Sequence, residues 1–132
     1  MKFHLLLIVL LTILNSCTPK SGDALIIDEW HEQIMEIHDT VMPELSTIHR
    51  LKKRIKKIDV DKVEVDKLIL INQLENADES MMSWMAGYRK PKKMESHTIQ
   101  FLQNQKVAVE SVDSIMMTTI KRAEEFLVKY EN

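Results

Sequence analysis

Apolar residues recur at intervals of three and four through three long stretches of this chain, and this spacing restricts the fold more than any other feature. It places the apolar side chains on one side of an α-helix, whereas a half-buried strand would show strict alternation. The chain has only two glycines and three prolines among 132 residues, too few for the turns of a β-sandwich or barrel. The sequence therefore predicts an all-α protein.

The first stretch runs from residue 28 to residue 58 and contains Pro43 near its middle. The proline does not shift the phase of the apolar stripe. We expect a kink there, because proline removes one backbone donor and crowds the preceding turn. The stripe consists of Trp30, Ile34, Ile37, Val41, Leu45, Ile48, Leu51, Ile55 and Ile58.

Two further stretches complete the pattern. The second begins where Asp61 and Glu64 have the spacing of a capping box, and it ends at Gly87 before Arg89-Lys90-Pro91. Its stripe is Val63, Leu70, Leu74, Ala77, Met81, Trp84 and Tyr88. After a connection from Pro91 to Ser96, the third stripe is Ile99, Leu102, Val109, Val112, Met116, Thr119, Ala123, Phe126 and Tyr130.

Short connections make consecutive helices antiparallel, so we expect residues 23–132 to form one domain, an up-down-up three-helix bundle. Seams as regular as these can also pair between chains, and an oligomeric coiled coil is the alternative architecture. Lys and Arg number 18 and Asp and Glu number 20, which gives a formal net charge of −2. This slight acidity argues against nucleic acid as a partner.

The first 17 residues have the pattern of a secretory signal peptide that ends in a lipid-attachment cysteine. Lys2 precedes the apolar run from Leu5 to Leu14, which is shorter than the ~20 residues that span a hydrocarbon core. Leu14-Asn15-Ser16-Cys17 resembles the lipobox of bacterial lipoproteins, although Asn15 is polar for its position. Cys17 is the only cysteine, so no intramolecular disulfide can form. We expect residues 1–16 to be removed, Cys17 to be acylated and residues 17–22 to form a linker.

Acyl chains such as palmitate on Cys17 would hold the protein at its membrane, since stable attachment needs two or more chains. The residues after Cys17 lack a run of acids, and we expect a lipid-anchored protein of the cell envelope that faces the periplasm. The alternatives are a plain secretory signal with a chance thiol and an uncleaved anchor helix.

Histidines and methionines form a second stripe beside the apolar seam of the first helix, within roughly 60° of one another. Thioethers and imidazole are the ligands that select copper(I). The same spacing fits adaptable methionines packing against a second neighbouring helix, and we favour packing for that reason. The first helix supplies His31, Met35, His38, Met42 and His49, and the second adds Met81, Met82 and Met85 around Trp84.

His38 is the most informative residue of this set, because it lies mid-helix among apolar neighbours and therefore needs a polar partner. Such histidines are more often hydrogen-bonded to a carboxylate or a carbonyl than bound to a metal. The adjacent Asp39 projects about 100° away around the helix and is not automatically that partner.

Enzymatic motifs are missing: there is no glycine-rich phosphate loop, no CxxC pair and no HExxH helix. We expect no catalysis and no cofactor other than the copper of the alternative hypothesis. The basic run Lys52-Lys53-Arg54-Ile55-Lys56-Lys57 suits contact with anionic lipid or an acidic partner, but a solvated face that complements the helix dipole is the favoured interpretation.

Two segments carry a family resemblance: Met35-Glu36-Ile37-His38-Asp39-Thr40-Val41-Met42-Pro43, followed by Arg50-Leu51-Lys52, and Ala77-Asp78-Glu79-Ser80-Met81-Met82-Ser83-Trp84-Met85. The chain resembles small bacterial lipoproteins catalogued as "viral A-type inclusion protein", although Ser80 stands where that family suggests alanine. The resemblance implies a helical lipoprotein without an assigned activity. It also implies that His38 faces Met81, Met82, Trp84 and Met85 across two antiparallel helices.

The sequence therefore predicts a membrane-tethered, non-catalytic interaction or scaffold module that binds an unidentified protein of the cell envelope. Trp84, His31 and His49 are the candidate interaction face. The alternative is a periplasmic copper(I)-binding lipoprotein that uses the His and Met face.

Overall fold

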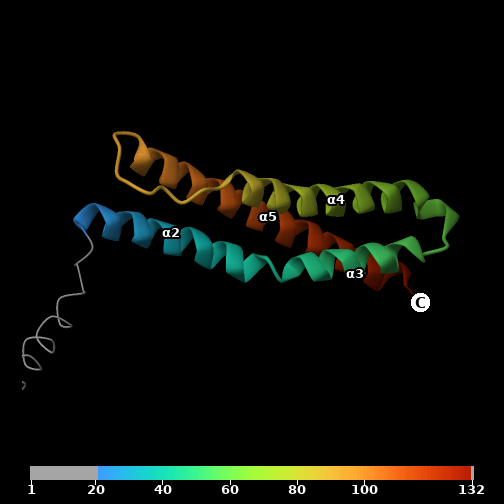
Figure 1. The fold of residues 1–132 in the computed structure, drawn as a ribbon. Helices are drawn as coiled ribbons and strands as arrows, with labels where there is room; N and C mark the ends of the chain where they lie inside the picture. The colour runs from blue at the N-terminus through green and yellow to red at the C-terminus, as the bar shows by residue number, and fades with distance from the viewer. Residues whose placement is uncertain (1–20, 132) are drawn as a thin grey trace, which may run out of the picture.

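The computed structural model describes residues 21–131, and the predicted signal peptide and Cys17 lie outside this range. It consists of α2 (Gly22–Val41), α3 (Glu44–Lys56), a 3-10 turn η2 (Asp61–Val63), α4 (Glu64–Gly87) and α5 (Thr98–Tyr130). Helices α2 and α3 follow each other as one broken rod, α4 returns antiparallel to it, and α5 runs back again (Figure 1). The described chain contains no strand, and the predicted up-down-up three-helix bundle is confirmed.

The bundle has two ends, which we name by their place in the chain. At the proximal end, the start of α2 lies beside the connection between α4 and α5; at the distal end, the α3–α4 connection lies beside the end of α5 (Figure 1). Between residues 21 and 131, no helix combines the length and apolar character needed to cross a bilayer.

Helix α2 begins earlier than the sequence suggested. The Ser21 side chain accepts a hydrogen bond from the backbone N–H of Ala24 at 3.3 Å, which is the bond of an N-cap residue. Gly22, expected as the last residue of the linker, is the first residue of the helix. The folded part therefore starts only five positions after Cys17.

The kink expected at Pro43 is a full break between two helices. Helix α2 ends at Val41, and the N–H of Met42 donates to the carbonyl of His38 at 2.8 Å to close its last turn. Pro43 has no N–H to continue this ladder, and the next bonds are shorter-range ones, from Leu45 N–H to the Met42 carbonyl and from Ser46 N–H to the Pro43 carbonyl. Helix α3 then continues in nearly the same direction (Figure 1).

The capping box expected at Asp61 and Glu64 does not form. The chain enters α4 through η2, so Asp61 lies inside the 3-10 turn and not at the cap position. No side chain caps either η2 or α4. Instead, the Lys67 ammonium donates to the carbonyl of Ile58 at 3.1 Å and fastens the first turns of α4 to the preceding connection.

Two clusters of buried side chains make the core. Helix α2 packs on α5, α3 packs on both α4 and α5, and α4 packs on α5, so the apolar seams pair within the chain, as in the bundle and unlike the coiled coil. The distal cluster contains Val41, Ile48, Leu51, Ile55, Ile58, Val63, Leu70, Leu74, Ala77, Met81, Val112, Met116, Ile120, Ala123 and Leu127. The proximal cluster contains Ile27, Ile34, Tyr88, Leu102 and Val109.

Candidate functional site: the seam between α2 and α4

Four ring side chains bridge α2 and the end of α4, and we call them the aromatic seam: His31 and His38 from α2, Trp84 from α4, and Tyr88 directly after α4. Because the two helices are antiparallel, the earlier residue of one meets the later residue of the other. The rings of His38 and Trp84 lie 5.7 Å apart between centroids, and those of His31 and Tyr88 lie 5.8 Å apart. Trp84 and Tyr88, which is four positions later and just past the end of α4, stack on each other with 5.2 Å between centroids.

His31 and Tyr88 form a hydrogen bond across the seam, with 2.8 Å between the His31 Nδ1 and the Tyr88 hydroxyl oxygen. Burial lowers the pKa of His31, and the nearby charge of Lys90 lowers it further, while Asp28 and Glu32 act in the opposite direction. Burial raises the pKa of Tyr88. Both shifts favour neutral rings at neutral pH. The sequence placed Tyr88 in the core stripe but gave no sign of this bond, apart from the general need of a buried tyrosine hydroxyl for a partner.

The His38 ring has a carboxylate partner, as expected of a histidine in this setting, and that partner is Asp39. The His38 Nδ1 and the Asp39 Oδ1 are 2.8 Å apart. The imidazole is only 12% exposed, whereas the Asp39 side chain is 71% exposed. Adjacent positions on a helix diverge by about 100°, but the longer imidazole reaches around to its neighbour. In a neutral ring, an Nδ1–H that donates to Asp39 leaves the lone pair of Nε2 available.

Trp84 lies where the two core clusters meet and packs against both. Its indole Nε1 is buried and finds no acceptor among the described residues. A buried donor without an acceptor typically costs about 1–3 kcal/mol. This tryptophan is therefore held by its ring contacts with His38 and Tyr88 and not by hydrogen bonding.

Among the candidate copper ligands, four methionines line the core and Met82 does not. Met81 is fully buried, Met42 and Met85 pack against the distal cluster, and Met35 packs against the proximal one. Met82 is 50% exposed, because it is one position removed from Met81 and so faces about 100° away from the core. The structure does not bring Met82 to the set of candidate copper ligands.

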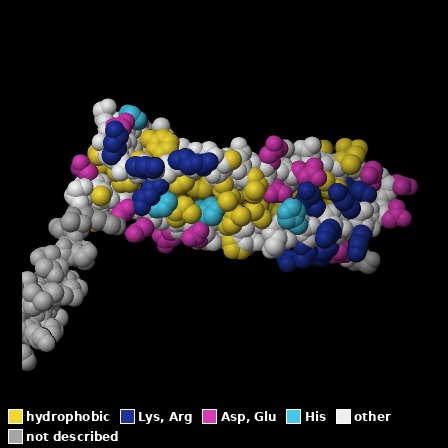
Figure 2. Space-filling view, in the orientation of Figure 1, with side chains coloured by type: hydrophobic (Ala, Val, Ile, Leu, Met, Phe, Trp, Pro, Cys, Tyr) yellow, Lys and Arg dark blue, Asp and Glu magenta, His cyan; other side chains and the backbone are white. Residues whose placement is uncertain are grey.

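His49 lies apart from the aromatic seam, on the exposed side of α3. Its Nε2 is 3.6 Å from a carboxylate oxygen of Asp78 on α4, and one turn further along α3 the Lys52 ammonium is 3.1 Å from Glu75. These pairs join α3 to α4 at the surface. Of the candidate interaction residues, His31 and Trp84 both contact Tyr88, while His49 is separate; Figure 2 shows histidines recurring along this face with hydrophobic side chains between them.

No group of three or more His, Cys, Asp and Glu residues in the described range is arranged to hold a metal ion. The candidate copper set is of a different kind, since it combines one imidazole with thioethers around His38. The arrangement can thus pack a core or bind a soft cation, and it presents no paired acid and base aimed at a shared cavity.

Comparison with protein-family models, with curated proteins and with solved structures finds no match to this chain. The described residues define a protein of the three-helix-bundle class.

Proposed function

We propose that this protein is a lipid-anchored helical module of the cell envelope that binds another envelope protein and has no catalytic activity. The observation that carries the proposal is the segment Leu14-Asn15-Ser16-Cys17, which resembles a lipobox and is followed after only four residues by the helix that begins at Gly22. A folded bundle placed directly after an acylation site suits a protein that works at the membrane surface. The resemblance of residues 35–43 and 77–85 to small bacterial lipoproteins supports the same proposal.

The partners of the histidines support a structural role for the seam. His31 is bonded to Tyr88, His38 to Asp39, and His49 is paired with Asp78. The contact of His31 joins α2 to the end of α4, and that of His49 joins α3 to α4 outside the seam, whereas the bond of His38 lies within α2 and fixes its ring. Imidazoles engaged in this way suit a structural role more than proton transfer to a substrate. Exposed side chains beside the seam would then contact the partner protein.

The anchor is tested with Cys17→Ala in intact cells. Wild-type protein should incorporate a radioactive fatty acid, fractionate with membranes and lose residues 1–16, whereas the variant should stay unlabelled and unprocessed or become soluble. Treatment of wild-type cells with an inhibitor of lipoprotein signal peptidase gives the matched control, in which the precursor accumulates. Continued labelling of the Cys17→Ala variant would contradict the proposal.

The interaction role is tested by photo-crosslinking in intact cells from an exposed position on α4. A photoreactive residue at Met82 should give a discrete adduct with one envelope protein. The same residue at Gln103, exposed on α5, is the control and should give none. Adducts of equal yield from both positions would count against a specific face.

A copper(I)-binding lipoprotein is the second candidate, and one observation favours it. Ligating histidines usually donate their other ring nitrogen to a carboxylate, which fixes the ring and the tautomer. The bond from His38 Nδ1 to Asp39 is of this type and leaves Nε2 as the coordinating atom. Met35, Met42, Met81 and Met85 would be the accompanying thioethers.

This second candidate is decided by titrating the protein with copper(I) under reducing conditions. If copper binds, His38→Ala should abolish binding, Asp39→Asn should weaken it about 10–100-fold, and Met82→Leu should leave it unchanged. Bound copper should also raise the melting temperature, because it binds only the folded state. Affinity no tighter than micromolar for the wild-type protein would exclude the candidate.

A further inference from the structure

The proximal end of the bundle exposes two adjacent aliphatic side chains. Leu25 and Ile26, in the first turns of α2, are 55% and 42% exposed, while the next residue, Ile27, is buried in the proximal cluster. The first turns of α4 at the distal end expose a comparable group, Val65, Leu68 and Ile69, so exposure alone does not set Leu25 and Ile26 apart. Their distinguishing feature is that they lie at the end of the bundle nearest to the proposed acylation site.

The length of the connecting chain places this pair close to the bilayer. Five residue steps separate Cys17 from Gly22, and an extended chain covers at most about 18 Å in that number of steps. Leu25 follows three helical residues later, which adds about 5 Å. If Cys17 carries the lipid, the backbone of Leu25 lies within about 23 Å of it and that of Ile26 within about 24 Å, and any less extended path brings both closer to the membrane surface.

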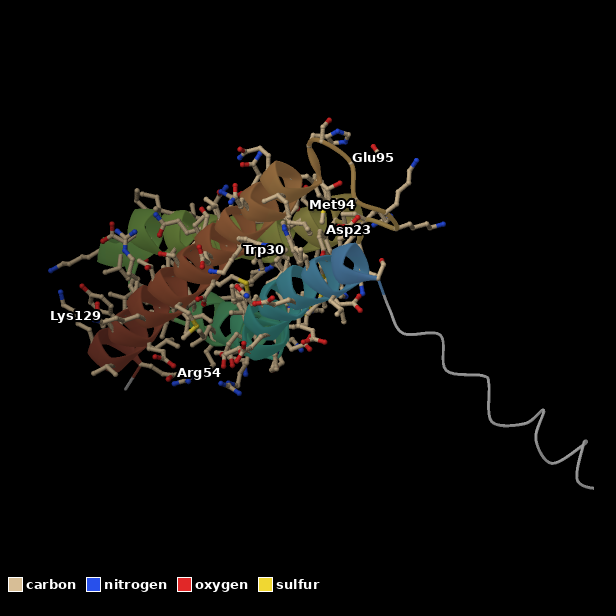
Figure 3. All side chains as sticks on the ribbon, turned by 90° about the vertical axis from the view of Figure 1, so that its left-hand side faces the viewer. Asp23, Trp30, Arg54, Met94, Glu95 and Lys129 are labelled. Carbon is tan, nitrogen blue, oxygen red and sulfur yellow. The ribbon has the colours of Figure 1, made fainter. Side chains whose placement is uncertain are left out.

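Cationic side chains lie at the same end. The α4–α5 connection carries Lys92 and Lys93, both exposed, and an ion pair between Lys90 and Asp28 fixes this connection against α2. Figure 3 shows Met94 of the connection near Asp23 of α2, with Glu95 further out on the same loop. The aliphatic pair and the lysines therefore belong to one surface, although Lys93 is also 3.0 Å from Glu95.

Acidic side chains at the proximal end limit how deeply it can enter the membrane. Glu29 lies one turn after Leu25 and Ile26 on the same exposed side of α2, and a carboxylate is costly to take out of water. Asp23 and Glu95 are likewise exposed. Only the first turns of α2 can enter the membrane–water interface. The long axis of the bundle would therefore point away from the membrane and not lie parallel to it.

We propose that the proximal end is a membrane-contact surface for a bilayer containing anionic phospholipid. Leu25 and Ile26 enter the interfacial region of the membrane to which Cys17 is attached, and Lys92 and Lys93 contact the phosphate-bearing headgroups. This inference depends on the proposed lipid anchor. It adds an orientation, in which the α3–α4 connection and the end of α5 point away from the membrane.

The test uses the full lipidated protein in vesicles of neutral phosphatidylcholine with or without anionic phosphatidylglycerol. Because acylation occupies the sulfur of Cys17, Leu25→Cys creates a unique thiol for an environment-sensitive fluorophore. The control is Val128→Cys, near the end of α5 and 85% exposed. With anionic vesicles, the label at position 25 should shift to the blue and resist an aqueous quencher, whereas the label at position 128 should do neither.

Charge reversal tests the cationic half of the surface. Lys92→Glu combined with Lys93→Glu should lower the equilibrium constant for contact between the proximal end and anionic vesicles by at least about tenfold. The matched control, Lys56→Glu combined with Lys57→Glu at the distal end of α3, should leave the label at position 25 unchanged.

Mass spectrometry of Cys17 in the same samples separates the two proposals. With acylated Cys17, a label at position 25 that is quenched as readily as the label at position 128 would overturn the membrane contact and leave the anchor intact. The label at position 25 could instead be protected from the quencher equally in neutral and in anionic vesicles, and equally with and without the charge reversal. That result would overturn the role of anionic lipid. An unacylated Cys17 would overturn both.

Discussion

The distal and proximal halves of this bundle are packed by different means. In the distal half, α3 lies against both α4 and α5, and aliphatic side chains fill the space between them. In the proximal half, α2 packs mainly on α5, and the rings of the aromatic seam span the distance from α2 to α4. Where three helices pack on one another, aliphatic side chains fill the core. Where α2 and α4 pack little on each other, ring side chains with polar atoms bridge them, and the candidate site lies there.

The largest expected effect comes from truncating the core in each half. Leu51→Ala, in the distal cluster, should cost about 4–5 kcal/mol of unfolding free energy, and Leu102→Ala, in the smaller proximal cluster, about 2–3 kcal/mol, because a smaller cluster collapses more readily around a cavity. Urea unfolding followed by circular dichroism measures both. Equal losses would mean that the two halves are equally rigid.

Met81 and Met82 provide a matched pair, since they are adjacent and differ in burial. Met81→Ala should cost about 2–4 kcal/mol, because its side chain is wholly buried, and Met82→Ala less than about 0.5 kcal/mol. The measurement is again urea unfolding, with wild-type protein as the reference. A large loss from Met82→Ala would indicate that this side chain is covered in solution.

Tyr88→Phe isolates the polar contact of the seam while retaining the ring. Loss of the bond to His31 should cost about 1 kcal/mol, in line with a neutral hydrogen bond. Thermal unfolding at neutral pH measures it, and the variant should keep native near-ultraviolet circular dichroism. No loss at all would show that the bond contributes nothing beyond the stacking.

The lowered pKa of His31 predicts a dependence of stability on pH. The unfolded chain takes up the proton near the ordinary value of 6.5, whereas the folded protein resists it because of burial first and Lys90 second. Stability should therefore be greatest above pH 6.5, fall on acidification through the interval down to the folded pKa, and level off below it. His31→Gln should remove this part of the pH profile, and an unchanged profile would contradict it.

The smallest expected effect is at the distal surface, where Arg54 and Glu131 form an ion pair. The hydrogen bond from Arg54 lowers the pKa of Glu131, so any stabilisation is present above pH 4.5 and disappears as the pH falls through the lowered value. Both groups are solvated and screened by salt. Glu131→Gln at physiological ionic strength should leave the melting temperature unchanged within experimental error, and a measurable decrease would show that the end of α5 is held more firmly.

Periodicity predicted most of the core, because Ile34, Leu74 and Met116 lie on the expected stripes and are fully buried. Periodicity did not predict the whole buried face of a helix that packs against several other helices. Helix α5 packs against α2, α3 and α4, so its buried face is wider than one stripe and includes Ile120 and Leu127, which the stripe omitted.

At the seam, the family resemblance implied that His38 faces Trp84, and the two rings lie 5.7 Å apart between centroids. Residue spacing alone did not predict this contact. It did not identify Asp39 as the partner of His38 or Tyr88 as the partner of His31. Both bonds depend on side-chain rotamers that are set by packing across helices, and residue spacing within one helix carries no information about them.

The break at Pro43 also has a consequence for how the protein opens. Helical hydrogen bonding cannot propagate across it, so α2 and α3 fray independently. Since α2 packs mainly on α5, its release would leave α3, α4 and α5 joined around the distal cluster. The first twenty or so residues of the folded chain then form a cooperative unit of their own, whose amides should exchange with solvent deuterium together and well before those of α4.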